Sequence, residues 1–94
     1  MRDRALQDCR AFVTGASSGI GEAIARAFAQ AGALVLVNYR SDREGAERVV
    51  EEINTCGGSA IAIQGDMSIS EDCSRLFDAA ANQFGGLDVG VANA

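Results

Sequence analysis

The chain has 94 residues, a net charge of −5, 48% hydrophobic and 22% charged residues, and neither histidine nor lysine. These values predict one small globular domain and exclude a histidine-containing catalytic triad, a Schiff-base lysine and a histidine metal site. The acidic charge disfavours nucleic acid and anionic membranes as partners, and no stretch has the ~18 apolar residues that a membrane span needs.

The first half of the chain begins with a strand, a helix and a second strand. A short apolar run predicts a strand at Arg10–Thr14, and a nearly all-apolar run predicts a buried strand at Ala33–Asn38. Gly32 lies where a left-handed cap would end the intervening helix. The apolar stripe of that helix is expected to contain Ile20, Ala23, Ile24, Ala27, Phe28 and Ala31.

The next predicted helix follows the second strand. Ser41 and Glu44 have the spacing of a capping box at its start. Gly57 and Gly58 follow its end. Its apolar face is expected to contain Ala46, Val49, Val50 and Ile53.

The last part of the chain predicts a strand at Ala60–Gln64, a helix, and a strand at Leu87–Ala92. Ser68 and Glu71 form a second possible capping box for this helix, and Gly85–Gly86 are expected to end it. The expected apolar stripe of the helix is Cys73, Leu76, Phe77, Ala80, Ala81 and Phe84.

The order of elements is therefore β-α-β-α-β-α-β. Strands that alternate with helices predict an α/β fold, a parallel sheet with right-handed crossovers. We expect a doubly wound, Rossmann-type sheet that is truncated. Residues 1–94 would then form the N-terminal part of one nucleotide-binding domain.

The turn after the first strand is rich in glycine. Gly15 would allow a tight turn, Gly19 would let a ligand approach the backbone, and Gly21 would let the helix pack closely on the sheet. Free N–H groups and the positive dipole at the helix N-terminus favour a pyrophosphate. The glycines could serve the turn alone, but their place between strand and helix favours a nucleotide. The expected binding residues are Gly15, Ser17, Ser18, Gly19, Ile20 and Gly21, with the two serines as hydroxyl donors.

The spacing Thr-Gly-x-x-x-Gly-Ile-Gly over residues 14–21 resembles the short-chain dehydrogenase/reductase family. Asp66 and Met67 resemble the family's adenine-contacting pair. Residues 87–94 resemble its fourth strand and the Asn-Asn-Ala-Gly motif, with Asn93 matching the second asparagine and Ala92 departing from the first. The resemblance implies hydride transfer between a nicotinamide cofactor and a small carbonyl or alcohol substrate. It also implies a homo-oligomer for the full-length form.

The end of the second strand bears on the choice of cofactor. An acidic residue at this point of dinucleotide folds binds the ribose 2′-hydroxyl, but here Tyr39 takes that position and Arg40 follows. A guanidinium can bind a phosphate with two hydrogen bonds, and Ser41 could donate a third. The sequence therefore favours NADP over NAD, with NAD still possible.

No residue of the chain is predicted to be catalytic. The resemblance implies a proton-donating tyrosine four residues before a lysine, whereas this sequence has one tyrosine, Tyr39, and no lysine. We therefore expect the chain alone to be inactive and its isolated form to be marginally stable. The alternatives are a non-catalytic dinucleotide-binding module and a remnant without a ligand.

The three cysteines are far apart, and they have no C-x-x-C spacing. This pattern predicts reduced thiols. The N-terminal residues also lack the apolar region of a secretory signal. Both features predict a cytoplasmic protein.

Overall fold

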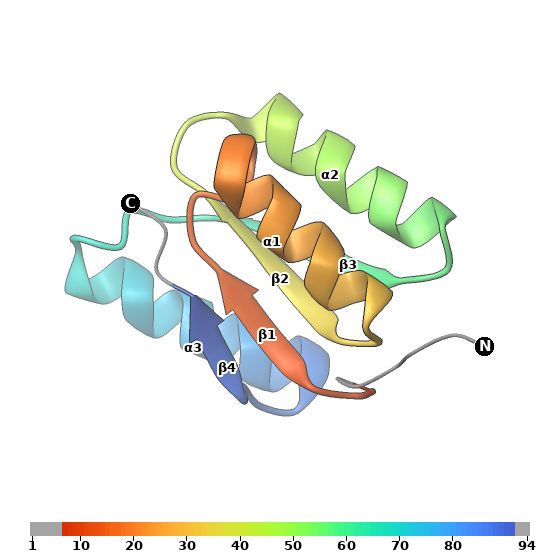
Figure 1. Cartoon of the computed structure of the whole chain (residues 1–94). Coiled ribbons are helices and arrows are strands. Elements are labelled where there is room, and N and C mark those ends of the chain that lie inside the picture. The colour runs from red at the N-terminus through yellow and green to blue at the C-terminus, as the bar shows by residue number, and fades with distance from the viewer. Residues whose placement is uncertain (1–6, 92–94) are drawn as a thin grey trace.

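The structure is a computed structural model, and it describes residues 7–91. Strands and helices alternate strictly along the chain, which confirms the predicted order (Figure 1). The elements are β1 (Arg10–Val13), α1 (Gly19–Gln30), β2 (Leu34–Tyr39), α2 (Arg43–Thr55), β3 (Ser59–Gln64), α3 (Ser70–Phe84) and β4 (Val89–Val91).

The four strands form one parallel sheet in the order β3-β2-β1-β4. Val13 of β1 pairs with Val37 of β2 on one side and with Val91 of β4 on the other. Helices α1 and α2 cover one face and α3 covers the other (Figure 1). The sheet is therefore doubly wound, as predicted, because the chain winds outward from β1 to β2 and β3 and then crosses back through α3 to place β4 on the other side of β1.

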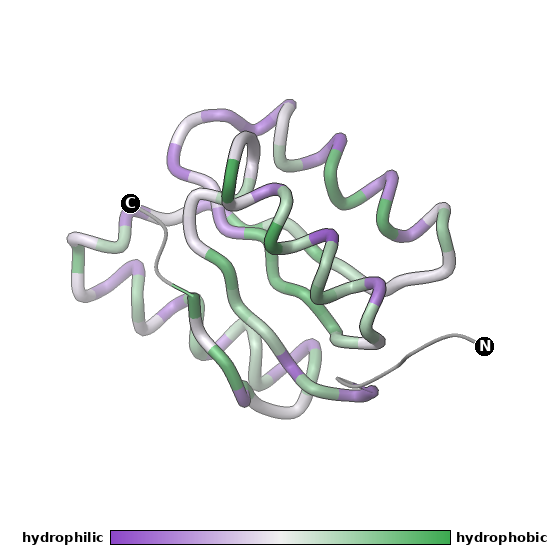
Figure 2. Tube along the Cα trace, in the orientation of Figure 1, coloured by the Kyte–Doolittle hydropathy of each residue, from purple (hydrophilic) through white to green (hydrophobic). Residues whose placement is uncertain are grey.

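The core between the sheet and α1/α2 consists of small and β-branched side chains. Val13, Val35 and Val37 are fully buried on the strands, and Val49 is fully buried on α2. In Figure 2 the strands are mostly green, whereas α2 carries many purple residues along its length. Near-continuous apolar strands of this kind are typical of a sheet that is covered on both faces.

The core between the sheet and α3 is smaller. Leu36 of β2, Leu76 and Ala80 are its buried members. Phe12, Ile61, Ile63, Met67, Phe84 and Leu87 pack around them and remain partly exposed. One helix therefore covers this face only in part.

The apolar stripe predicted for α1 is displaced by about one residue. Gly21, Ala25 and Ala29 are the buried residues, whereas Ile20 is 72% exposed and Ala23 is also exposed. The prediction for Ile20 is wrong because the small residues allow α1 to lie close to the sheet. In α3, Leu76 and Ala80 are buried as expected, whereas Phe77 and Ala81 are exposed.

Both predicted capping boxes are wrong, because other residues occupy the cap positions of α2 and α3. Asp42, rather than Ser41, caps α2, and its Oδ1 accepts a hydrogen bond from the Gly45 N–H at 3.0 Å. The cap position of α3 is Ile69, which offers no side-chain hydrogen bond, so Ser68 does not cap this helix. Several polar residues precede each helix, and the geometry of the preceding loop decided which of them reached the first turn.

The predicted helix ends are confirmed. Gly32, Gly57 and Gly85 follow α1, α2 and α3 with φ angles of +101°, +91° and +82°. Glycine suits these positions because residues with a side chain rarely adopt positive φ. Each helix consequently stops where its glycine lies and returns the chain to the sheet.

Candidate functional site

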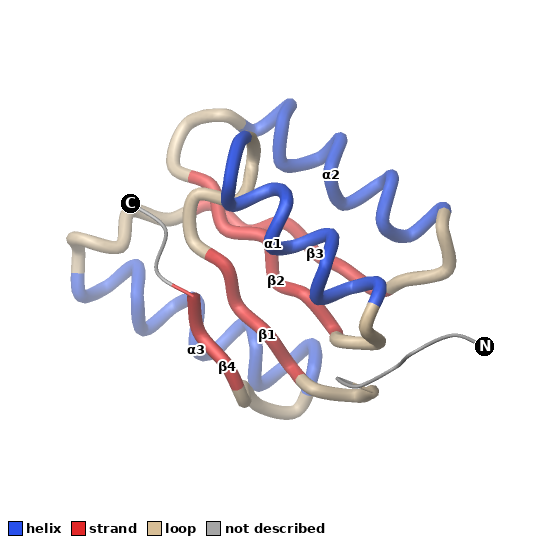
Figure 3. Tube along the Cα trace, viewed as in Figure 1, coloured by secondary structure: helices blue, strands red, loops and turns tan. Residues whose placement is uncertain are grey.

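Three loops meet at the carboxyl ends of the strands. They follow β1, β2 and β3 and lie at the same end of the sheet (Figure 3). Ligands of open parallel sheets bind at this end, beside the strand where the crossovers diverge. That strand is β1, and the loop that follows it is the predicted glycine loop.

The glycine loop runs from a buried strand directly into α1. Thr14, the first residue of the loop, is bound to β4: its N–H and its Oγ1 both donate to the Val91 carbonyl, at 3.0 and 3.3 Å. The Ala16 N–H donates to the Asn38 carbonyl at the end of β2, at 3.0 Å. The loop is thus anchored to the strands on both sides of β1.

The outer side of the loop is open. Gly15 and Gly19 have φ angles of +58° and +62°, and both residues are exposed. A Cβ atom built on Gly19 would meet no atom within 4 Å. The backbone at Gly19 can therefore be approached directly from solvent, as the sequence predicted.

The N-terminus of α1 lies at this open side. Its cap residue, Ser18, makes no side-chain hydrogen bond to the first turn, and both Ser18 and Ile20 are exposed. The first-turn N–H groups and the helix dipole favour an anion here. Ser17 is half-buried, and Gly21 is buried against the sheet as expected.

Glu22 places a carboxylate in the same first turn. Two arginines bind it: the guanidinium of Arg48 donates at 3.2 and 3.3 Å, and Arg26 Nε donates at 2.9 Å. Their hydrogen bonds lower the pKa of Glu22. The carboxylate in the first turn of α1 is therefore paired with cations on α1 and α2.

Arg40 and Ser41 lie between β2 and α2, and both are exposed. Arg40 makes no ion pair within residues 7–91. Every other arginine of that range pairs with a carboxylate: Arg10, Arg26, Arg43, Arg48 and Arg75. Arg40 is thus the one guanidinium without an ion pair in the described part of the chain, and the residue lies in the β2–α2 loop, at the same end of the sheet as the glycine loop.

Asp66 and Met67 lie in the loop after β3. Oδ1 of Asp66 accepts hydrogen bonds from the N–H and Oγ of Ser68, at 2.9 and 2.7 Å. These bonds are the main reason that the pKa of Asp66 is lowered, and Arg40 adds a smaller electrostatic effect. Asp66 is therefore held as an anion, able to accept a hydrogen bond from a ligand amine.

Neighbouring residues of α3 fix the same loop. The Asp66 N–H donates to Asp72 Oδ2 at 2.8 Å, and the Cys73 thiol donates to the Met67 carbonyl at 3.4 Å. The three predicted groups of residues therefore come from three loops at one end of the sheet. Asn93, the remaining predicted contact, lies outside the described residues.

Asn38 is a site residue that the sequence analysis missed. It is only 3% exposed and is the one buried polar residue among residues 7–91. Its Nδ2 donates to the carbonyls of Gly65 and Ile63, at 3.2 and 3.4 Å. Its own carbonyl binds Ala16, so Asn38 connects the glycine loop with the loop that carries Asp66. An asparagine directly after the apolar run Leu34–Val37, within the same strand, was the available signal.

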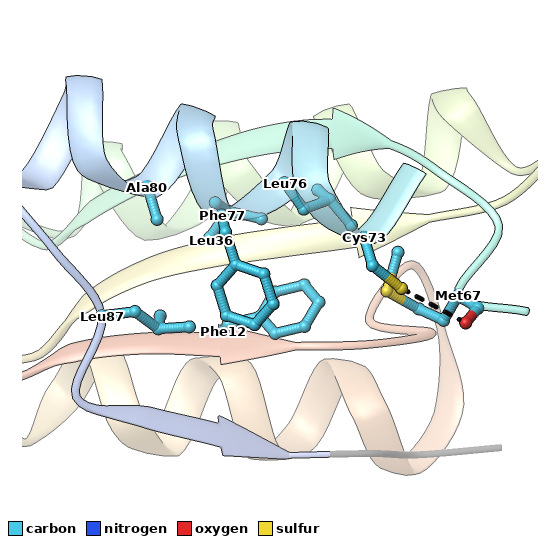
Figure 4. Close-up of a pocket in the computed structure, with 8 residues that line it drawn as sticks. All are labelled: Phe12, Leu36, Met67, Cys73, Leu76, Phe77, Ala80 and Leu87. Atoms are coloured by element: carbon cyan, nitrogen blue, oxygen red, sulfur yellow. Dashed lines mark hydrogen bonds between the residues drawn. The ribbon is translucent and has the colours of Figure 1, made fainter. Parts of the chain in front are cut away.

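A hollow of about 130 Å³ opens on the α3 face (Figure 4). Carbon and sulfur atoms line it: Phe12, Leu36 and Leu87 on the sheet side, Leu76, Phe77 and Ala80 on α3, and Met67 with Cys73 at one end. A surface without polar side chains cannot orient a substrate or move a proton. The hollow reflects the incomplete cover of this face and adds no chemistry to the site.

Residues 7–91 contain neither a metal-binding cluster nor a membrane-spanning helix. No group of three or more histidine, cysteine and carboxylate side chains there could hold a metal ion. None of the helices in that range is long and apolar enough to span a membrane.

Comparison with known proteins decides the family. The family model for short chain dehydrogenases matches residues 10–94. The chain belongs to the short chain dehydrogenase family. The predicted resemblance to this family is thereby confirmed.

Relatives within the short chain dehydrogenase family are named as oxidoreductases. The chain is 51% identical over 82 residues to 3beta-hydroxysteroid dehydrogenase 1 of Eggerthella lenta, covering 87% of this chain and 31% of that protein. It is 50% identical over 84 residues to versicolorin reductase stcU of Emericella nidulans, with coverage of 89% and 32%. The chain thus spans about a third of the length of these relatives.

A solved structure of the family supports the fold. A short chain dehydrogenase from Burkholderia cenocepacia, in complex with NADP, matches with a TM-score of 0.90 and 46% identity. The match covers 98% of this chain and 37% of that one. The arrangement of sheet, helices and loops seen here is therefore that of the family.

Proposed function

We propose that this chain is the NADP(H)-binding part of a short-chain oxidoreductase. In this proposal the first turn of α1 and the glycine loop hold the pyrophosphate, and Asp66 and Met67 face the adenine. The NADP complex of the Burkholderia cenocepacia relative supports a nicotinamide dinucleotide as the ligand. Bound there, the nucleotide would supply or accept a hydride, while the residues of this chain bind and orient it.

The preference for NADP(H) is supported by one observation above all. Arg40 is exposed, lies in the β2–α2 loop at the same end of the sheet as the glycine loop, and makes no ion pair in the described chain. A guanidinium without a partner can bind a 2′-phosphate with two hydrogen bonds, and Ser41 lies next to it. The absence of an acidic residue at Tyr39 removes the group that would repel that phosphate.

Titration with NADPH and NADH tests this preference. The protein to use is the longest natural protein that contains the chain, and calorimetry would give both dissociation constants. We expect Arg40→Ala to weaken NADPH binding roughly 10- to 100-fold, because a hydrogen-bonded charge is lost, and to leave NADH binding nearly unchanged. Arg43→Ala is the matched control, since Arg43 is an exposed neighbour that pairs with Glu47 at 3.1 Å. Equal loss of both nucleotides in Arg40→Ala would contradict the proposal.

We further propose that the catalytic groups lie outside this chain, in a protein that transfers a hydride between NADP(H) and a carbonyl or alcohol. Residues 1–94 would be the N-terminal part of its nucleotide-binding domain, inactive alone. The sequence encoded after Ala94 tests this point: a downstream Tyr-x-x-x-Lys is expected. An immediate stop codon would contradict it and leave the non-catalytic module or the remnant, which NADPH titration would separate.

The complete protein would work in the cytoplasm and form a homo-oligomer. Cys9, Cys56 and Cys73 are all free, which fits a reducing compartment. Sedimentation of the complete protein tests the oligomer, and a monomer would contradict it.

A further inference from the structure

The first turn of α2 lies directly against the glycine loop. A Cβ atom built on Gly45 would stand 2.7 Å from the Ser17 carbonyl oxygen, and it would also clash with the Asp42 carboxylate. Real Cβ contacts are essentially never shorter than 3.0 Å. Gly45 thus brings the two backbones closer than any other residue would allow.

The segment that leads to Gly45 is held firmly in place. The Arg40 carbonyl accepts a hydrogen bond from Gln64 Nε2 at 3.1 Å, which ties the segment to the end of β3. The Asp42 carboxylate accepts the Gly45 N–H, and the Asp42 carbonyl accepts the Ala46 N–H at 3.1 Å. Because both ends are tied, an added side chain at Gly45 has to separate the turn from the glycine loop.

The same contact sets how Arg40 and Ser41 lie relative to Ser17 and Ser18. One pair precedes α2 and the other precedes α1, and the approach of Gly45 to Ser17 is the place where these two turns meet. A phosphate that is bound by groups from both turns needs them at hydrogen-bond distances of about 2.7–3.2 Å. A shift of a few tenths of an ångström would therefore weaken binding.

We propose that Gly45 is a positioning residue for selectivity between NADP(H) and NAD(H). Its missing side chain allows the β2–α2 turn and the glycine loop to converge on one 2′-phosphate. This inference rests on the proposed function. The proposed function attributes selectivity to the charge of Arg40, whereas this inference adds the spacing of the two turns as a second cause.

The test is Gly45→Ala, with the dissociation constants of NADPH and NADH measured on the longest natural protein that contains the chain. We expect the preference for NADPH over NADH to fall by about tenfold, equivalent to the loss of one hydrogen bond to a charged group. NADH affinity should change less than about threefold, because NADH lacks the 2′-phosphate. An equal change in both affinities, or no change in their ratio, would overturn the inference.

Stability measurements separate positioning from a structural defect. The added Cβ of Gly45→Ala should lower the melting temperature through its clashes with Ser17 and Asp42, and the higher helix propensity of alanine offsets part of that loss. Asp42→Ala removes the cap and its carboxylate without adding an atom beside Ser17, so it should lower the melting temperature, and its NADPH-to-NADH ratio is the reference for any variant that also lacks Asp42. Glu51→Ala, at an exposed position of the same helix, should change neither quantity.

A double variant and the wild-type protein separate failure of this inference from failure of the proposed function. If Gly45→Ala does not fold, the double variant Asp42→Ala/Gly45→Ala removes the side-chain clash and retains the clash with Ser17. The same tenfold fall in the ratio is expected for it, and an unchanged ratio would overturn the inference. A wild-type protein that binds neither nucleotide would instead overturn the proposed function itself.

Discussion

The two faces of the sheet are completed to different degrees. On the α1/α2 face, twelve buried residues form one cluster, and the ion pairs Glu22–Arg48 and Arg26–Glu52 connect the two helices. On the α3 face, the buried cluster has three members and Phe77 is 55% exposed. The difference teaches that the described chain supplies a complete core only beneath the helices that position the glycine loop.

The largest expected effect compares one core residue from each face in the 94-residue chain. Ile53→Ala, at a position that is 4% exposed, should reduce the free energy of unfolding by about 2–4 kcal/mol, because it leaves a cavity beneath α2. Phe77→Ala should cost no more than about 0.5 kcal/mol, since half of that ring already contacts water. Urea unfolding with sodium sulfate as a stabiliser would measure both. Similar costs would show that the two faces do not differ.

Self-association of the isolated chain should give an intermediate effect. Phe77, Ile69 and Val89 expose apolar surface on or near α3 and β4, and β4 is an edge strand of the described sheet. We expect sedimentation to show concentration-dependent association that Phe77→Glu reduces severalfold. Ala27→Glu, at an exposed position on α1, is the control and should reduce it much less. A cooperative melt of a monomeric wild-type chain would contradict this prediction.

The smallest effect concerns the attachment of β4 to β1. Asp88 accepts hydrogen bonds from the backbone N–H, Nε and Nη2 of Arg10, at 2.8, 2.9 and 3.0 Å. These bonds lower the pKa of Asp88 from 3.8 to about 2. The resulting stabilisation is present above pH 3.8 and is lost as the pH falls towards 2.

Asp88→Asn tests that attachment. The variant should melt slightly below the wild-type chain at neutral pH, and the difference should shrink as the pH falls from about 4 to 2. Thermal melts followed by circular dichroism over this range would measure it. A difference that persists unchanged at pH 2 would show that the carboxylate charge is not the cause.

Much of the fold could be predicted because its signals are local. The apolar runs predicted which segments form strands, and strand bounds differ from the predicted ones by at most two residues where they are described. The glycine loop was predictable because Gly15 and Gly19 do adopt the positive φ that only glycine tolerates easily. Asp66, Met67 and Asn93 were predicted from their resemblance to family motifs.

The parts that could not be predicted depend on contacts between distant residues. Asn38 gains its role from carbonyls that lie 25 and 27 residues away, and Gly45 gains its role from Ser17. Asp42 displaced Ser41 as the cap of α2 because the loop placed its carboxylate on the Gly45 N–H. The spacing of residues along the chain does not predict such tertiary contacts.

By itself, the sequence determined the alternation of strands and helices, the glycine loop between β1 and α1, and the absence of lysine from the chain. Those features follow from hydrophobic periodicity, from backbone freedom at glycine and from composition, all of which are properties of short segments. Only the tertiary structure decided that Ile20 faces solvent, that Arg40 is left without a carboxylate among the described residues, and that Gly45 abuts Ser17. Burial, charge pairing and close packing depend on which elements meet in space, and that is set by the whole sheet.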